Sequence, residues 1–172
     1  LVLDGVDTVS LAPHKFYGLG GSGLLIRRRN VELYPLIQGG ASVTAYRSGT
    51  PTLALGAALE VALRLALTHN AERISIVEKH NRTLRRALSA YSNVVVNSPE
   101  DAVPHILNLS VKDVKGTVFQ RALNEFGVCV SVKSACSTDG QPSKAVLAVC
   151  HDSRNALSSW RISLSHLTTD EE

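Results

Sequence analysis

The sequence predicts a mixed α/β fold in two parts, of which the second is a small α+β domain. Strand-like runs alternate with amphipathic helical patterns, and a long helical stretch separates the first pair of strands from the later ones. Hydrophobic residues make up 44% of the 172-residue chain, enough for a packed core, and charged residues only 19%. This composition argues against disorder. No apolar run reaches the about 18 residues that a membrane helix needs.

The first part opens with two predicted strands, in the runs VDTVSLAP and GLLIRRR, joined by a glycine-rich turn. A polar loop, ASVTAYRSGT, follows. Thr50 and Pro51 then predict a helix start, with the threonine as cap and the proline at the first helical position. Leucines four residues apart form one stripe on this helix, at positions 55, 59, 63 and 67. The run THN (68–70) is expected to break or bend the helix before a second one begins.

The second helix has one apolar face, made of Ile74, Val77, Leu84 and Leu88. Strands are then predicted in the runs NVVVN, HILNLSV, VCVSV and SWRISLS. Helices are predicted in TVFQRALNEF and PSKAVLAV. Gly127 is expected to be the C-terminal cap of the first of these helices. We therefore expect residues 1–70 to end one domain and residues 71–172 to form a compact domain of their own.

Two motifs point to other binding functions. Gly18, Gly20 and Gly23 match the spacing of a dinucleotide fingerprint, but that fingerprint opens a helix and this run leads into a predicted strand. Arg27–Arg29 could bind phosphates, yet such a run is more often a solvated strand end. The net charge of +3 permits an anionic ligand without requiring nucleic acid.

Lys15 is the first candidate for chemistry, in the run APHKFYG at the end of a strand. Apolar neighbours disfavour the charged form of a lysine, so its amine becomes a better nucleophile and can form a Schiff base with a carbonyl cofactor. The adjacent His14 could donate a hydrogen bond to an anionic group. A solvated lysine beside a structural histidine is the competing interpretation.

Cys136 is the second candidate, because it lies in a loop of small and polar residues near Lys133. Such a setting suits a reactive thiol, whereas structural cysteines lie among apolar side chains. We interpret Cys129, in a predicted strand, and Cys150, after an apolar helix, as structural. The cysteine spacings of seven and fourteen match no zinc template.

Arg161 is the third candidate. It lies on the polar face of the last predicted strand and offers a planar fork to a carboxylate. A surface ion pair is the alternative.

The runs HKFYG, RSGT, SACS and RISLS, in this order and at these separations, resemble the NifS/IscS-type cysteine desulfurases. These enzymes belong to the class V aminotransferase superfamily and have the fold type I architecture. The resemblance implies pyridoxal 5'-phosphate as cofactor. It also implies that residues 1–70 end the large cofactor-binding domain and that residues 71–172 are the small C-terminal domain.

The resemblance assigns a role to each matching residue. Lys15 holds the cofactor through its amine, His14 contacts the cofactor phosphate, and Thr50 reaches the phosphate in the partner subunit of a homodimer. Cys136 takes the sulfur of L-cysteine as a persulfide and passes it to an acceptor protein, leaving L-alanine. Arg161 binds the substrate carboxylate.

Two features depart from the family pattern. Ala12 stands where the family usually has a phosphate-binding serine. The family's ring-stacking histidine and its aspartate at the pyridine nitrogen belong to an N-terminal half without counterpart in this sequence. Since the sequence also begins with Leu1 and has no Met, we expect a fragment of a longer protein that is inactive alone.

Other functions remain open beside the desulfurase. The parent protein could be another class V aminotransferase, a selenocysteine lyase, or a non-catalytic sulfur-relay or scaffold protein. For a desulfurase, we expect a cytoplasmic protein whose sulfur acceptor serves iron–sulfur cluster assembly or tRNA thiolation. We expect no direct nucleic-acid or membrane partner and no metal site.

Overall fold

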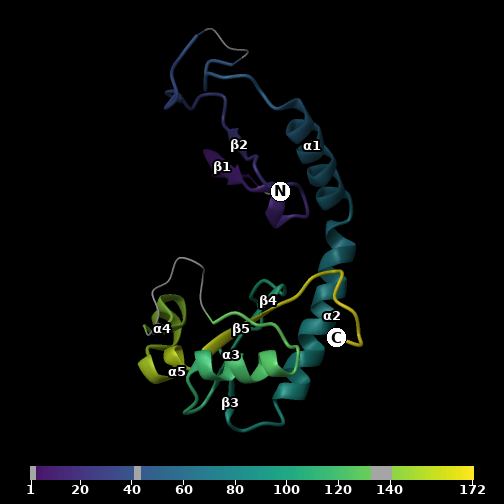
Figure 1. Ribbon diagram of the computed structural model, residues 1–172, viewed down its shortest axis with the longest axis vertical. Helices are drawn as coiled ribbons and strands as arrows, with labels where there is room; N and C mark the ends of the chain where they lie inside the picture. Colours follow the sequence, from purple (N-terminus) through teal and green to yellow (C-terminus); the bar gives the residue numbers. More distant parts are fainter. Residues whose placement is uncertain (1–2, 41–43, 133–140) are drawn as a thin grey trace. The chain divides into compact units, whose positions relative to one another are not determined.

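The computed structural model describes residues 3–40, 44–132 and 141–172. The chain forms two compact units, Leu1–Asn70 and Ala71–Glu172 (Figure 1). Both contain helices and antiparallel strands, as the mixed α/β prediction requires. Within the described residues, no helix is both long and apolar enough to cross a membrane.

The first unit begins with an antiparallel strand pair, β1 (Thr8–Leu11) and β2 (Leu24–Arg27), which confirms both predicted strands. A short 3₁₀ turn, η1 (Pro13–Lys15), directly follows β1. The glycine-rich turn then leads straight into β2. Because no helix opens after these glycines, the geometry of a dinucleotide-binding fingerprint is absent from this described segment.

The arginine run that follows β2 has a structural role. The Arg27 guanidinium donates to the carbonyl oxygen of Val31 at 2.6 Å and stacks on the ring of Tyr46. The Arg28 guanidinium donates to the carbonyl oxygen of Val6 at 2.7 Å. Two of the three arginines therefore hold their own loop in place, which argues against phosphate binding by this run.

Helix α1 (Leu53–Thr68) has Thr52 as its N-cap residue, so the predicted start at Thr50 is wrong by two residues. Thr50 and Thr52 are the same residue type and both fit an N-cap, and the structure uses Thr52, whose backbone is extended. His69 caps the other end, and α2 (Asn70–Leu88) begins at the next residue. The predicted break at residues 68–70 is confirmed.

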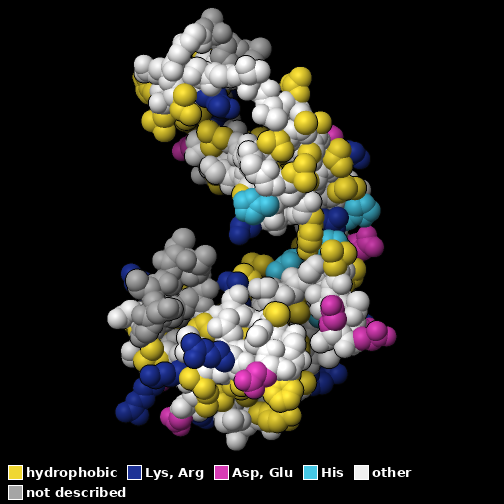
Figure 2. Space-filling model, viewed as in Figure 1, with side chains coloured by type: hydrophobic (Ala, Val, Ile, Leu, Met, Phe, Trp, Pro, Cys, Tyr) yellow, Lys and Arg dark blue, Asp and Glu magenta, His cyan; other side chains and the backbone are white. Residues whose placement is uncertain are grey.

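The leucine stripe of α1 is only partly covered within its unit. Leu55, Leu59 and Leu63 are half-buried, whereas Leu67 is exposed. Figure 2 shows hydrophobic side chains gathered along this helix. The apolar pattern therefore predicted the helix correctly, but the described residues of this unit do not bury the whole stripe.

The second unit is built on a three-stranded antiparallel sheet in the order β3-β4-β5 (Figure 1). Its strands are β3 (Val94–Val96), β4 (Ile106–Val111) and β5 (Ser159–Ser163). Its further helices are α3 (Gly116–Glu125), α4 (Lys144–Cys150) and α5 (Ser153–Leu157), of which α5 was not predicted.

One face of this sheet carries the hydrophobic core. Leu107, Leu109, Val111 and Trp160 are buried there, as the alternation in the sequence predicts. Helices α2 and α3 cover this face through Leu84, Leu88, Phe119 and Leu123. The ring of Phe119 lies 5.0 Å from that of Trp160, centroid to centroid.

The opposite face of the sheet is polar. Asn108 and Ser110 of β4 alternate with the core residues and so lie on this second face. The Ser110 hydroxyl donates to the carbonyl oxygen of Asn155 in α5 at 2.9 Å. Helices of the segment 144–157 therefore meet the sheet on the side away from the core.

The predicted strand VCVSV is reduced to one bridge, between Ser131 and Arg161. The preceding helix takes two further backbone groups of this segment. The Val128 N–H donates to the Leu123 carbonyl in the C-terminal cap of α3, and the Val130 carbonyl accepts from the Gln120 amide. A segment whose hydrogen bonds go to a helix cannot also extend a sheet.

Two helix ends test the capping predictions. Gly127 has a φ of +77° just after α3, which confirms it as the cap. Helix α4 does not begin at Pro142, because Ser143 is its N-cap residue and accepts a hydrogen bond from the Val146 N–H. A serine hydroxyl satisfies a free N–H of the first turn, which a proline side chain cannot do.

Candidate functional site

The turn that carries His14 and Lys15 is locked by its own backbone. The Lys15 N–H donates to the Ala12 carbonyl and the Phe16 N–H to the Pro13 carbonyl, both at 2.9 Å. Pro13 is fully buried. A buried proline with fixed φ anchors the two polar residues that follow it.

Gly18 holds this turn against α1. Its N–H donates to the Pro13 carbonyl at 2.8 Å. A Cβ atom at this glycine would lie 2.8 Å from the Pro13 Cβ and 3.1 Å from the Ala62 Cβ on α1. The close approach therefore requires glycine at this position.

His14 and Lys15 themselves are exposed. The expectation that apolar neighbours enclose Lys15 is thus wrong for the described residues, because the turn buries Pro13 and leaves the next two side chains outside. The amine and the imidazole are side by side in sequence and accessible to a ligand.

Thr50 lies in the same unit, exposed in the loop that precedes α1. Among the described residues no hydrogen bond joins it to His14 or Lys15. The structure therefore does not bring these three predicted cofactor residues together through direct contacts.

Cys136 lies outside the described residues. The other two cysteines are free thiols. Cys129 is exposed and belongs to no strand, so its interpretation as a structural strand residue is wrong. Cys150 is half-buried at the end of α4, where the Asp152 N–H donates to its sulfur at 3.4 Å.

Arg161 is half-buried in β5. Its backbone pairs with Asn108 of β4 on one side and with Ser131 on the other. Its side-chain Nε donates to the hydroxyl of Ser163 at 3.1 Å. Among the described residues, neither terminal nitrogen of this guanidinium has a hydrogen-bond partner, so both are available for an end-on fork on a carboxylate.

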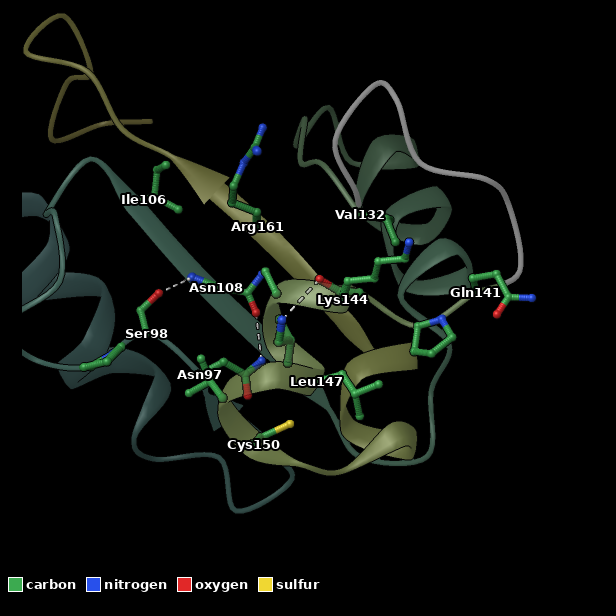
Figure 3. A pocket seen from close by; sticks show the side chains of 16 residues that line it. Asn97, Ser98, Ile106, Asn108, Val132, Gln141, Lys144, Leu147, Cys150 and Arg161 are labelled. Carbon is green, nitrogen blue, oxygen red and sulfur yellow. Dashed lines mark hydrogen bonds between the residues drawn. The ribbon is translucent and has the colours of Figure 1, made fainter. Parts of the chain in front are cut away.

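Arg161 lines a cavity of about 890 Å³ on the polar face of the sheet (Figure 3). Strands β4 and β5 form one wall and α4 another. The described lining residues include two cationic side chains, Lys144 and Arg161, and no carboxylate. This charge balance favours an anionic ligand.

Sequence reasoning missed the polar residues beside Arg161, namely Asn97, Ser98 and Asn108, which line the same cavity. The alternation in β4 places Asn108 on the polar face. That Asn108 lies opposite Arg161 depends on the strand register, which no local pattern contains.

Residues 4–172 match the Aminotransferase class-V family, and the chain belongs to this family. A cysteine desulfurase IscS from Dictyoglomus turgidum is 34% identical over 98% of this chain and 43% of its own length. A cysteine desulfurase from Pongo abelii is 36% identical over 97% of this chain and 37% of its own. The chain thus spans less than half the length of these relatives.

Solved structures show the same relationship. The NifS-like protein from Rickettsia africae superposes with a TM-score of 0.83 and 27% identity, over 97% of this chain and 44% of that one. Another NifS-like protein gives a TM-score of 0.81 and 28% identity. The fold of the chain is therefore part of the NifS-like fold.

Class V aminotransferases use pyridoxal phosphate, and the turn after β1 has the donors that this group needs. An aldehyde requires an accessible amine, and a phosphate requires N–H donors. Lys15 and His14 supply both from a turn held by backbone hydrogen bonds. Ala12, at the N-cap of this turn, adds no side-chain donor.

Proposed function

We propose that this chain is part of a pyridoxal-phosphate-dependent cysteine desulfurase, which converts L-cysteine to L-alanine and passes the sulfur to an acceptor protein. The observation that carries this proposal is the exposed His14–Lys15 pair on a backbone-locked turn, in a member of the class V aminotransferase family. The names of the cysteine desulfurase relatives support the choice of reaction.

The first unit supplies the cofactor residues. Lys15 holds the cofactor through its amine, and His14 donates to the cofactor phosphate. When bound, pyridoxal phosphate withdraws electrons from the α-carbon of an amino acid. Thr50 contacts the phosphate in the partner subunit of a homodimer, which is consistent with its place in an exposed loop.

The second unit supplies the substrate residues. Arg161 binds the carboxylate of L-cysteine through its terminal nitrogens. The Cys136 thiolate attacks the substrate sulfur, so an S–S bond forms while the Cβ–S bond breaks. The electron pair of the broken bond stays with Cβ, which takes up a proton and gives L-alanine.

The two units correspond to two parts of the longer enzyme. Residues 1–70 end its large cofactor-binding domain, and residues 71–172 are its small C-terminal domain. The protein acts in the cytoplasm, and its sulfur acceptor is an iron–sulfur scaffold or a tRNA-thiolation protein. Because the chain spans less than half of its relatives, we expect it to have no desulfurase activity alone.

The cofactor assignment is tested by adding pyridoxal phosphate to the purified chain and recording its visible spectrum. Lys15→Ala should abolish the absorption band of the bound cofactor, whereas Lys144→Ala, a change at another exposed lysine, should keep it. A band that persists in Lys15→Ala refutes the assignment. If neither chain gives a band, the same pair of variants is compared in the longer protein.

The reaction is tested in the longer protein by measuring alanine formed from L-cysteine and, with a thiol added as the reductant of the persulfide, sulfide. Cys136→Ala should abolish this activity while the cofactor spectrum stays unchanged. Full activity in Cys136→Ala would instead favour a selenocysteine lyase, which does not need this thiol. An aminotransferase would form neither product in either protein, because it leaves the Cβ–S bond intact.

A further inference from the structure

We propose that Asn108 is a second binding residue for the substrate carboxylate, and that its side-chain N–H donates to the group that Arg161 holds. This inference rests on the proposed function, since it assumes a carboxylate at Arg161. It adds a residue whose position results from strand register and from a network of amide side chains.

The strand register places Asn108 beside Arg161. The two residues are direct cross-strand partners in the β4–β5 pair. Side chains of such partners leave the same face of the sheet, with Cβ atoms about 4.5–5.5 Å apart. Both residues line the cavity on the polar face, as Figure 3 shows.

A network of side chains sets the direction of the Asn108 amide. The Asn155 Nδ2 donates to the Asn97 Oδ1 at 2.7 Å, so the Asn97 amide nitrogen must face the other way. That nitrogen donates to the Asn108 Oδ1 and to the Ser110 hydroxyl, each at 2.8 Å. The Ser110 hydroxyl in turn donates to the Asn155 carbonyl. The network therefore occupies the carbonyl end of Asn108.

The nitrogen end of Asn108 remains available. Within the described ranges, no hydrogen bond involves its Nδ2. The backbone of Asn108 is also fixed, because its N–H donates to the Ser98 hydroxyl at 2.8 Å (Figure 3). A donor held in this way needs no rearrangement to meet a ligand acceptor.

The charge of the cavity selects the kind of acceptor. Its described lining residues contain two cations and no carboxylate, so an anionic ligand is favoured over a cationic one. For an amino acid bound at Arg161, the anionic acceptor is the α-carboxylate. Asn108 would then share this group with the guanidinium, as an uncharged donor beside a charged one.

The test is an NMR titration of the ¹⁵N-labelled chain with L-alanine, which carries the carboxylate but has no sulfur to transfer. We expect the Asn108 side-chain amide and the Arg161 Nε–H signals to shift with one common dissociation constant. If the Arg161 signal shifts and the Asn108 amide does not, the inference is refuted and the proposed function stands. If neither signal shifts, the carboxylate site at Arg161 is refuted and the inference with it, whereas the cofactor role of Lys15 is tested separately by the visible spectrum.

Variants provide a second test, which measures the affinity for L-alanine and does not depend on assigning a single NMR signal. Asn108→Asp keeps the acceptor for Asn97 but replaces the free donor by a negative oxygen, so L-alanine binding should weaken at least tenfold. Asn108→Ser restores a donor and should recover most of the affinity. Asn124→Asp makes the same charge change on exposed α3 and should alter the affinity less than twofold.

The outcomes separate the two proposals. Equal effects of Asn108→Asp and Asn124→Asp would refute a donor role for Asn108. Unchanged L-alanine binding in Arg161→Ala would refute the carboxylate site itself. Backbone spectra that match the unmodified chain away from the cavity show that each variant is folded.

Discussion

The Nε of Arg161 donates a hydrogen bond to the hydroxyl of Ser163, two residues further along the same strand, at 3.1 Å. Both side chains lie on the polar face of β5, because residues two apart in a strand share a face. The bond holds the guanidinium by Nε, so an end-on carboxylate fork can still use both terminal nitrogens. Ser163 is therefore a positioning residue for Arg161.

Ser163→Ala removes this support. An intramolecular hydrogen bond typically contributes about 0.5–1.5 kcal/mol, so KM for L-cysteine should rise about twofold to tenfold. The kcat should stay within about twofold, since Ser163 does not touch the reacting sulfur. Steady-state kinetics of the longer protein measure both values, with the exposed Ser89→Ala as control. An effect on kcat alone would contradict this role.

Gly18→Ala should loosen the turn that carries Lys15. The new methyl group would lie within 3.1 Å of Pro13 and Ala62 atoms, and such overpacking costs about 1–3 kcal/mol. Hydrogen exchange at the Gly18 and Phe16 amides, both bonded to the Pro13 carbonyl, should accelerate. Gly20→Ala is the matched control, because no atom lies within 4 Å of its added Cβ. Equal exchange in both variants would contradict the packing argument.

Gly116→Ala should destabilise the second unit. The added Cβ would lie 2.4 Å from the Ser159 carbonyl oxygen at the start of β5. Because backbone cannot move as a flexible side chain does, we expect a loss of about 3 kcal/mol in the free energy of unfolding, the upper end for overpacking. Urea denaturation followed by Trp160 fluorescence measures this change.

Gly56→Ala provides the comparison for this second glycine. Gly56 lies inside α1 with no atom within 4 Å of its added Cβ. Alanine in an open helical position stabilises by roughly 0.5–1 kcal/mol. Circular dichroism during urea denaturation should show a small gain in stability, opposite in sign to the effect of Gly116→Ala.

The C-terminal segment meets α2 through a pH-dependent contact. Lys79 Nζ donates to Asp170 Oδ1 at 2.9 Å. The pKa of Asp170 lies below its usual range because of this hydrogen bond, the charge of Lys79 and the nearby His80. The contribution to stability is therefore present above about pH 4, the ordinary aspartate pKa, and is lost as the pH falls through the lowered pKa of the folded state.

A carboxyl-carbon NMR titration of Asp170 checks this contact. Lys79→Ala should raise the Asp170 pKa toward its ordinary value, and high salt should have the same direction of effect because both side chains are exposed. Lys112→Ala should leave the pKa unchanged. An unchanged value in Lys79→Ala would contradict the assignment.

Several elements could be predicted because their signals are local. The alternation of Leu107, Leu109 and Val111 determines which face of β4 is buried, and Gly127 supplies the positive φ that ends α3. The order of HK, RSGT, SACS and RISLS also predicted the class V family that the comparison shows. Each of these signals depends on neighbouring residues or on motif order alone.

Two predicted elements differ from the structure because segments elsewhere in the chain, or equivalent neighbouring residues, compete for the same role. The run VCVSV has strand propensity, yet α3 takes the hydrogen bonds of Val128 and Val130, and only Ser131 reaches β5. The helix start at Thr50 was misplaced because Thr50 and Thr52 both fit a cap and the sequence does not rank them.

For the candidate site, the sequence by itself determined which residues have the required chemistry: an amine at Lys15, an imidazole at His14 and a guanidinium at Arg161. Only the tertiary structure decided that Lys15 is exposed, and that Asn108 lies opposite Arg161 with its carbonyl end occupied by Asn97. Residue type is a local property. Burial and register follow from which segments pair across the fold, and pairing reflects the free energy of the whole unit rather than of one segment.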